Sequence, residues 1–457
     1  MNERPKQIPV KRRRWPRILL AVLVVFATLY AGYRYTLHRM VEAKLDEIRK
    51  QGYPVTLAEL DKCYPQVPAG ENAADVYLEA FKHLPGRHNS DTNLPIVGDA
   101  ELPPRTAPMP PEMQQAVERY LAANREVLDL LHEAAAKRAC RYPLNMLDAD
   151  MAIKSKMIIF SPIRRIRQGA RLLDLDALSA SAVGDPQRAT DAVASSLALA
   201  QSLGDRSLPV SYAAGQTCLR LTISSLEQAL NRTAFTEQQL VELSAAFRKV
   251  ETEDAFTRAI IGERALANEQ WKEIRDGKVS VQEEMVHLPG PGDTGEKFDP
   301  EIAAIYRRSG LVDLDYLVYL GFLRGLIESS SVPFPTRFER IDSLTRNAQK
   351  WRLHPLARME AYLWGYLARR DARFIAQLRV VCTVIAVERY RLANGTVPDS
   401  SSVLAPQFLA AVPTDPFDGQ PLRYKKLGKG YVVYSVGEDG KDDGGDEKKD
   451  ITFTVER

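Results

Sequence analysis

Cysteine and histidine are scarce in this sequence of 457 residues, and neither is grouped. The four cysteines contain no C-x-x-C pair, which excludes zinc-ribbon and thioredoxin-type motifs. Their even number permits disulfides, although Cys218 and Cys382 lie in apolar helical patterns and are expected to be buried thiols. H-E-x-x-H, G-x-S-x-G and G-x-G-x-x-G are all missing. An enzymatic activity is therefore uncertain, and the sequence favours a non-enzymatic role.

A strong excess of one charge is also missing, because 62 basic residues face 59 acidic ones. Residues 1–17 hold seven basic side chains and one acid, so the chain beyond them has a net charge of −3. The basic isoelectric point belongs to this tail, and we expect no nucleic-acid partner.

One long apolar run, Ile18–Tyr33, carries no charge between Arg17 and Arg34. Its 16 residues give about 24 Å of helix, and the flanking arginines can reach the interfaces of a core about 30 Å thick. We expect a transmembrane anchor at 18–35, a cytoplasmic tail at 1–17, and the remainder in the periplasm. The protein would then be a single-pass protein of the inner membrane. A cleaved signal peptide is the alternative, but no clear small-residue cleavage site follows the run.

Apolar residues at helical spacing dominate residues 36–370 and predict a mainly α exported domain built from helical hairpins. One helix is expected to begin at Thr236, where Gln239 completes a capping box. A Gly/Pro-rich loop at 286–299 has Glu296 where a phosphate-binding loop needs lysine, so that function is rejected. The expected helices cover 71–84, 111–138, several consecutive segments within 163–231, 236–277, 300–330, 337–350 and 355–394.

Residues 371–457 change character and predict a small α+β module with antiparallel strands. An apolar-striped helix ends at Asn394-Gly395 and is followed by a short helix at 402–409. Strands are expected at 422–424, 431–436 and over the final I-T-F-T-V segment.

The loop between the last two strands is the strongest chemical signal in the sequence. Residues 438–450 hold seven acids, three lysines and several glycines. Hard oxygen ligands on a tightly curved turn suit Ca²⁺, which takes six to eight oxygens, and the lack of nearby His or Cys disfavours zinc and copper. The candidate ligands are Asp439, Asp442, Asp443, Asp446 and Asp450. The alternative is a solvated acidic loop that binds nothing.

The spacing resembles an EF-hand loop in length, with Asp439 in the first position and Asp450 in the twelfth. Lys441 occupies the third position and cannot act as a ligand, and strands flank the loop where an EF-hand has helices. An EF-hand is therefore excluded.

Residues 377–451 resemble the C-terminal globular part of the major (G-type) pseudopilin of type II secretion. The matching segments are ERYRLANG at 388–395, Pro398, VPTDPFDGQPLRY at 412–424, YVVYSVGEDG at 431–440 and GGDEKKDI at 444–451. The resemblance implies a calcium site in the last loop. Asp439 and Asp450 match the family's aspartates there, and Asp442, Asp443 and Asp446 are additional acids.

A prepilin-peptidase site is missing, and more than 300 residues separate the anchor from the module. We therefore expect a membrane-anchored envelope protein with a binding or structural role, carrying a pseudopilin-like module that binds calcium. Two alternatives remain open: an accessory subunit of type II secretion whose partners are secretion proteins, and an envelope hydrolase with an unrecognised site.

Overall fold

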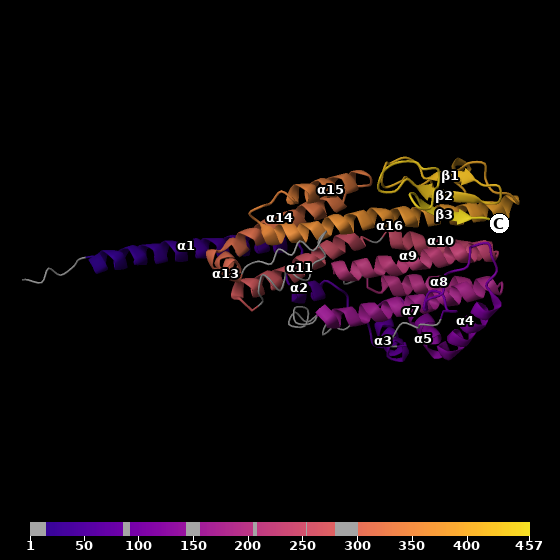
Figure 1. Cartoon of the computed structure of the whole chain (residues 1–457), viewed down its shortest axis with the longest axis horizontal. Helices are drawn as coiled ribbons and strands as arrows, with labels where there is room; N and C mark the ends of the chain where they lie inside the picture. Colours follow the sequence, from indigo (N-terminus) through magenta and orange to yellow (C-terminus); the bar gives the residue numbers. More distant parts are fainter. Residues whose placement is uncertain (1–14, 86–91, 143–155, 204–207, 253, 279–299) are drawn as a thin grey trace, which may run out of the picture.

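A computed structural model of the chain describes residues 15–85, 92–142, 156–203, 208–252, 254–278 and 300–457 (Figure 1). The expected tail at 1–17 is described only from residue 15, and the 286–299 loop lies outside the described residues. The helices are α1 Trp15–Lys50, α2 Leu57–Lys62, α3 Ala73–His83, α4 Pro111–Ala123, α5 Arg125–Ala135, α7 Lys156–Ala182, α8 Pro186–Gln201, α9 Pro209–Arg232, α10 Glu237–Thr252, α11 Ala255–Asp276, α13 Pro300–Ser309, α14 Leu311–Ser330, α15 Thr336–Ala348 and α16 Pro355–Asn394. A 3₁₀ turn, η3 (Ser401–Leu404), precedes three strands, β1 Arg423–Lys426, β2 Tyr431–Ser435 and β3 Ile451–Val455.

The mainly α fold class with a small antiparallel module is confirmed. The sheet order is β1-β2-β3, with Tyr424 opposite Val433 and Val433 opposite Phe453. The four cysteines are free, and Cys218 and Cys382 are buried as expected.

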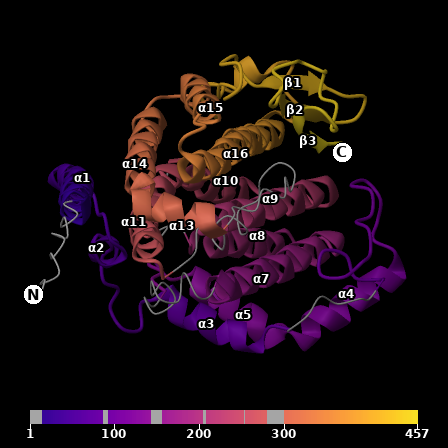
Figure 2. The same cartoon turned by 60° about the vertical axis from the view of Figure 1, so that its left-hand side comes forward.

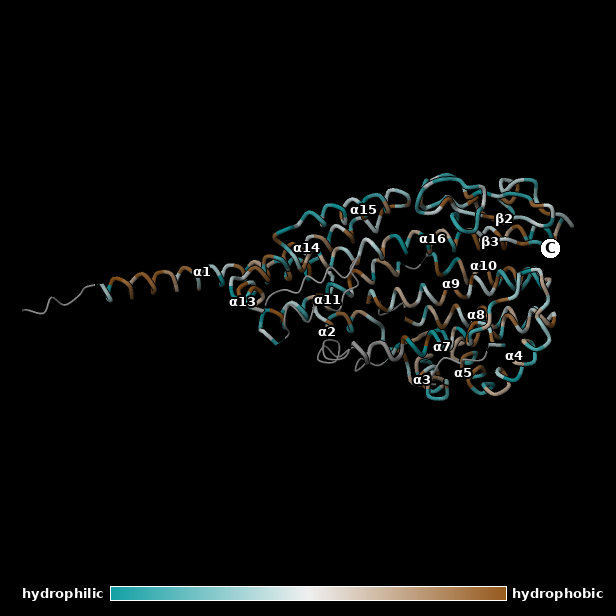
Figure 3. Tube along the Cα trace, in the orientation of Figure 1, coloured by the Kyte–Doolittle hydropathy of each residue, from teal (hydrophilic) through white to brown (hydrophobic). Residues whose placement is uncertain are grey.

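Helix α1 projects from the body as a single rod, and its exposed part is the most continuous apolar stretch of the trace (Figures 1 and 3). It is long and apolar enough to span a membrane, and its most apolar window is not buried. Burial begins only at Leu37 and continues at Val41, Leu45 and Ile48, where α1 packs against α14. These positions recur every three or four residues, so one face of the second half of α1 belongs to the body.

Two hydrophobic cores divide the molecule. One joins α3 to α10 with the strands, and the other joins the second half of α1 with α11, α14 and α15. Helix α16 contributes to both cores: its residues up to Ala368 belong to the second core, and those from Phe374 onward belong to the first. No break marks the expected boundary at 370/371, so the helical body and the C-terminal module share this helix.

Three expected helical ranges are each two helices in the structure: α4 and α5, α10 and α11, and α13 and α14, the last pair separated at Gly310. Asn124 leaves the helical conformation between α4 and α5, and its side-chain amide bonds the Tyr120 carbonyl at 2.8 Å. Asp254 begins α11, because its carboxylate accepts the Thr257 N–H at 3.2 Å. The predicted 236–277 helix is therefore interrupted between α10 and α11. Both residues prefer caps to helix interiors because their side chains compete for backbone hydrogen bonds. The expected helix at 402–409 is only the η3 turn.

Candidate metal site

The acidic loop connects β2 to β3, the two longest strands of the module. Gly445 shows why glycine is needed there: its φ is +84°, and a Cβ would lie 3.3 Å from side-chain atoms of Tyr434 and Val432. The backbone thus turns back closely over β2, in a conformation that other residues rarely adopt.

Three of the five candidate aspartates make contacts with other residues of the loop. Asp439 accepts the Lys441 N–H at 3.1 Å, and Asp446 accepts the Lys448 N–H at 2.9 Å. Asp443 pairs with Lys449 at 2.8 Å. These contacts are short-range, so each carboxylate stabilises its own turn of the loop.

The other two aspartates face the strands. Asp442 accepts the Tyr434 hydroxyl and the Gly444 N–H, both at 3.0 Å. Burial and this carboxylate raise the pKa of Tyr434 to about 12, so the phenol remains a donor. Asp450 is 6 % exposed, and its Oδ2 accepts the Gly445 N–H at 2.8 Å. Its Oδ1 is buried and makes no hydrogen bond.

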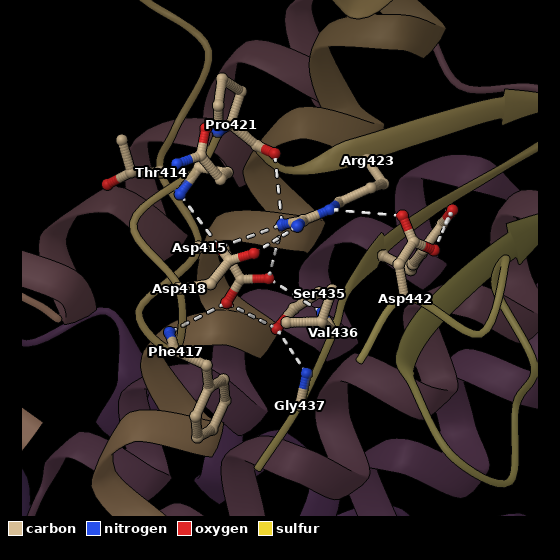
Figure 4. A network of polar contacts seen from close by, with 12 residues as sticks. Thr414, Asp415, Phe417, Asp418, Pro421, Arg423, Ser435, Val436, Gly437 and Asp442 are labelled. Atoms are coloured by element: carbon tan, nitrogen blue, oxygen red, sulfur yellow. Dashed lines mark hydrogen bonds and ion pairs between the residues drawn. The ribbon is translucent and has the colours of Figure 1, made fainter. Parts of the chain in front are cut away.

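A buried polar network centred on Asp415 lies at the end of β2, where the loop begins (Figure 4). Asp415 is fully buried and accepts the N–H groups of Phe417 (3.0 Å) and Val436 (2.8 Å) and the hydroxyl of Ser435 (2.9 Å). Burial raises the pKa of this carboxyl, and the hydrogen bonds oppose that rise. The network joins the 413–421 turn to the end of β2, where the loop begins.

Arg423 on β1 connects this network with the loop (Figure 4). Its guanidinium contacts Asp415 at 3.2 Å, pairs closely with Asp418, and lies 3.7 Å from Asp442. The hydrogen bond from Arg423 lowers the pKa of Asp418. Arg423 therefore holds three carboxylates on one side of the sheet.

The five predicted ligands lie on one loop, but each carboxylate bonds to its own partner in the loop or the strands. Among the residues that the structure describes, no three His, Cys, Asp or Glu side chains form a group that could hold a metal ion. The donors available are all oxygens, which is the chemistry of Ca²⁺ or Mg²⁺ sites. The orphaned Asp450 Oδ1 fits a cation, because a buried carboxylate oxygen without a donor is costly unless something pairs with it.

Asp415 and Arg423 are functional candidates that sequence reasoning missed. Both lie in the VPTDPFDGQPLRY segment, which contributed to the pseudopilin resemblance but was not considered as a functional site. An aspartate before Pro and an arginine eight residues later carry no periodic signal, and only the folded turn brings them within 3.2 Å.

A second cluster bears on the hydrolase alternative. His132 Nδ1 lies 2.8 Å from Ser195 Oγ, and His132 Nε2 lies 4.0 Å from Asp176, beside a cavity of about 600 Å³ between α5, α7 and α8. The residue types match a catalytic triad, but Asp176 is bound by two nitrogens of Arg188, at 3.0 and 2.5 Å. Ser195 sits inside α8, where backbone N–H groups already serve the helix and offer no oxyanion hole. This geometry does not support acyl transfer.

No family model, no curated protein and no solved structure matches this chain.

Proposed function

We propose that this protein is a single-pass envelope protein, anchored in the inner membrane by residues 18–35, whose pseudopilin-like C-terminal module binds Ca²⁺ in a binding or structural role. The membrane anchor is supported by the exposure of α1, whose apolar window is exposed along its whole length. Water-exposed apolar surface of this extent is unfavourable unless lipid covers it. The basic residues at 1–17 favour a cytoplasmic N-terminus and a periplasmic body.

The calcium proposal is supported by Asp450. This carboxylate is almost fully buried, yet one of its oxygens has no partner. A bound cation would compensate its charge, and Asp439 and the carbonyl groups of the glycine-rich turn would supply further oxygens. The ion's contribution would be to tie the 437–450 loop to the strands, because a ligand that binds only the folded state stabilises it.

Thermal unfolding of the full chain in lipid nanodiscs tests the site. Millimolar Ca²⁺ should raise the unfolding midpoint relative to EGTA, since saturation at a hundred times Kd adds about 2.7 kcal/mol. Mg²⁺ at the same concentration should act more weakly because it requires stricter octahedral geometry. An identical midpoint in Ca²⁺ and EGTA would overturn the calcium proposal.

Two variants and a control locate the effect. Asp450→Asn and Asp439→Ala should each abolish the calcium shift, and Asp439 is exposed and bonds the Lys441 N–H within its own turn, so its loss should leave the chain folded. Asp399→Asn is the matched control, because Asp399 is an aspartate of the same module whose side chain is 95 % exposed and pairs with Lys426. A calcium shift that survives Asp439→Ala and Asp450→Asn would place the ion elsewhere.

The accessory-subunit alternative makes a different prediction. If the module docks on pseudopilins, the full chain should co-purify with secretion components from detergent-solubilised membranes. Their absence from such a purification would leave the anchored, independent envelope protein as the better proposal.

A further inference from the structure

The last turn of helix α13 contacts α1 at the end of the body from which α1 projects (Figure 1), and the rest of α13 extends away from α1 (Figure 2). Helix α13 is ten residues long, and one turn at Gly310 separates it from α14. Gly310 has a φ of +84°, and a Cβ there would lie 2.8 Å from Leu37 and 3.3 Å from Arg34. The α13–α14 corner is therefore packed as closely on α1 as the backbone permits.

The contacts of α13 with α1 fall at the C-terminal end of the apolar run, from Tyr30 within it and from Arg34 immediately after it. Arg34 Nη1 donates to the carbonyls of Arg307 and Arg308, each at 3.0 Å. The Tyr30 hydroxyl donates to the same Arg308 carbonyl. These carbonyls belong to the last turn of α13, where free acceptors remain, so α1 caps α13. The end of α13 thus lies level with residues 30–34 of α1.

Within the residues that the structure describes, α13 exposes two isoleucines on one face, with Glu301 and Arg308 beside them. Ile302 and Ile305 are 55 % and 65 % exposed and are three residues apart, hence on one side of the helix. Tyr306, one turn after Ile302, borders this face on the side of the body, is 5 % exposed, and bonds Asp315 of α14. Arg308 is exposed beside the apolar face.

The depth of α1 in the bilayer decides what covers this face. The uncharged run Ile18–Tyr33 spans about 24 Å, less than the roughly 30 Å hydrocarbon core, so it cannot be shortened further and still cross. Residues 30–34 must then lie at the outer interface. A helix fixed at that level has lipid, and not bulk water, next to its exposed face.

We propose that α13 lies in the outer interface of the membrane, with Ile302 and Ile305 inserted among the lipid chains and Arg308 at the phosphate groups. The occupant of this surface is the lipid bilayer, because the last turn of α13 is bonded to Tyr30 and Arg34, which lie at the outer interface when α1 spans the membrane. Amphipathic helices bind interfaces in this way, and arginine beside the apolar face favours anionic lipids. The inference rests on the proposed membrane anchor. With α13 inserted, the body is held to the membrane at two points, which limits its rotation about α1.

Site-specific fluorescence on the full chain tests the inference. Cys63 and Cys140 are replaced by serine, and single cysteines are introduced as Ile305→Cys, Leu23→Cys and Val403→Cys. Each is labelled with the environment-sensitive dye NBD in vesicles of phosphatidylcholine and phosphatidylglycerol that contain a lipid-borne doxyl quencher. Leu23 reports the span itself. Val403 is 46 % exposed in the C-terminal module, which lies at the far end of the molecule from α1 (Figure 1).

The expected result is a loss of dye intensity at positions 23 and 305 and none at 403. Quenching at 23 without quenching at 305 would overturn the inference and leave the anchor intact. Quenching at neither position would overturn both proposals. A spectral blue shift at 305 that needs no lipid and grows with protein concentration would assign the face to a second copy of the chain, and would also overturn the inference. Raising the phosphatidylglycerol fraction should increase quenching at 305.

Discussion

At the scale of single residues, buried carboxylates are the most informative feature of this fold. Asp174 on α7 is 1 % exposed, and its Oδ1 accepts the Ser196 hydroxyl at 3.1 Å, with the hydroxyls of Thr222 and Ser225 also close enough to interact. Its Oδ2 is buried and unsatisfied. Burial raises the pKa of this group to about 8. The native state thus holds the proton that the unfolded chain releases near pH 4.

Asp174→Asn is expected to stabilise the protein at pH 8. Because the pKa of Asp174 is raised in the folded state, the unfolded state ionises first, and wild-type stability falls as pH rises from about 4 to about 8. Asparagine cannot ionise and avoids this loss. The gain should be on the order of a few kcal/mol at pH 8 and should vanish near pH 4. Urea unfolding across this pH range measures it, with Asp191→Asn on the exposed face of α8 as control. Equal pH dependence in variant and wild type would contradict the assignment.

Asp415→Ala tests the network under the acidic loop. The change removes the acceptor for two backbone N–H groups, the Ser435 hydroxyl and the Arg423 guanidinium, at a carboxylate that is fully buried. Unsatisfied buried groups of this kind cost about 1–3 kcal/mol each, and partial relaxation should leave a total near 3–5 kcal/mol. Thermal unfolding gives the size of the loss. Asp415→Asn keeps one acceptor oxygen and should lose less; equal losses in both variants would mean that the charge, and not hydrogen bonding, matters there.

At the scale of elements, capping residues set where helices begin. The capping box of α10 is present as predicted: the Gln239 N–H bonds Thr236 Oγ1 at 3.3 Å, and the Thr236 N–H bonds Gln239 Oε1 at 2.9 Å. Thr236→Ala should lower the unfolding free energy by about 1 kcal/mol, because one N–H at the helix start loses its acceptor. Gln238→Ala, an exposed change in the same turn, should lie within about 0.5 kcal/mol of wild type. A similar loss in both variants would show that helix propensity, and not the cap, is responsible.

Local signals explain which elements sequence reasoning could find. Helix α16 runs from Pro355 to Asn394 as expected, since a proline suits its first turn and Gly395, with φ +74°, closes it. The three strands were found to within about two residues by their β-branched and aromatic content. The breaks at Asn124 and Asp254 were missed because the apolar periodicity continues across both positions.

The candidate site likewise has features that the sequence reveals and features that only the folded structure reveals. The acidic loop and its glycines are visible in the sequence because they are contiguous. The unpartnered Oδ1 of Asp450 and the junction at Arg423 depend on burial and on contacts across the sheet. Neither follows from spacing alone, because a carboxylate's partners are chosen by the tertiary structure.

At the scale of the whole molecule, the C-terminal module is docked into the helical body by polar contacts as well as by the shared helix. Strand β3 is an edge strand, and its outer backbone groups meet α9. The Thr454 N–H donates to Glu227 Oε1 at 2.8 Å, while Arg105 bridges Glu227 at 3.1 Å and pairs with Glu447 of the acidic loop. Side chains of α9 thus hydrogen-bond the backbone at the edge of β3, which could otherwise pair with a strand of another chain.

Asn231 makes the strongest test of this docking. Its Nδ2 donates to the Thr454 carbonyl and its Oδ1 accepts the Glu456 N–H, both at 2.8 Å, at a site where Asn231 is 8 % exposed. Asn231→Ala leaves both backbone groups unsatisfied and should cost about 2–4 kcal/mol. Hydrogen exchange followed by mass spectrometry should show faster exchange in β3 and the acidic loop than in α7, because the module loosens before the body unfolds. Asn231→Asp keeps the acceptor for Glu456 and should give an intermediate loss. If exchange instead rises equally in β3 and α7, the module and the body form one cooperative unit, and α16 and the shared core, not the polar contacts to α9, hold them together.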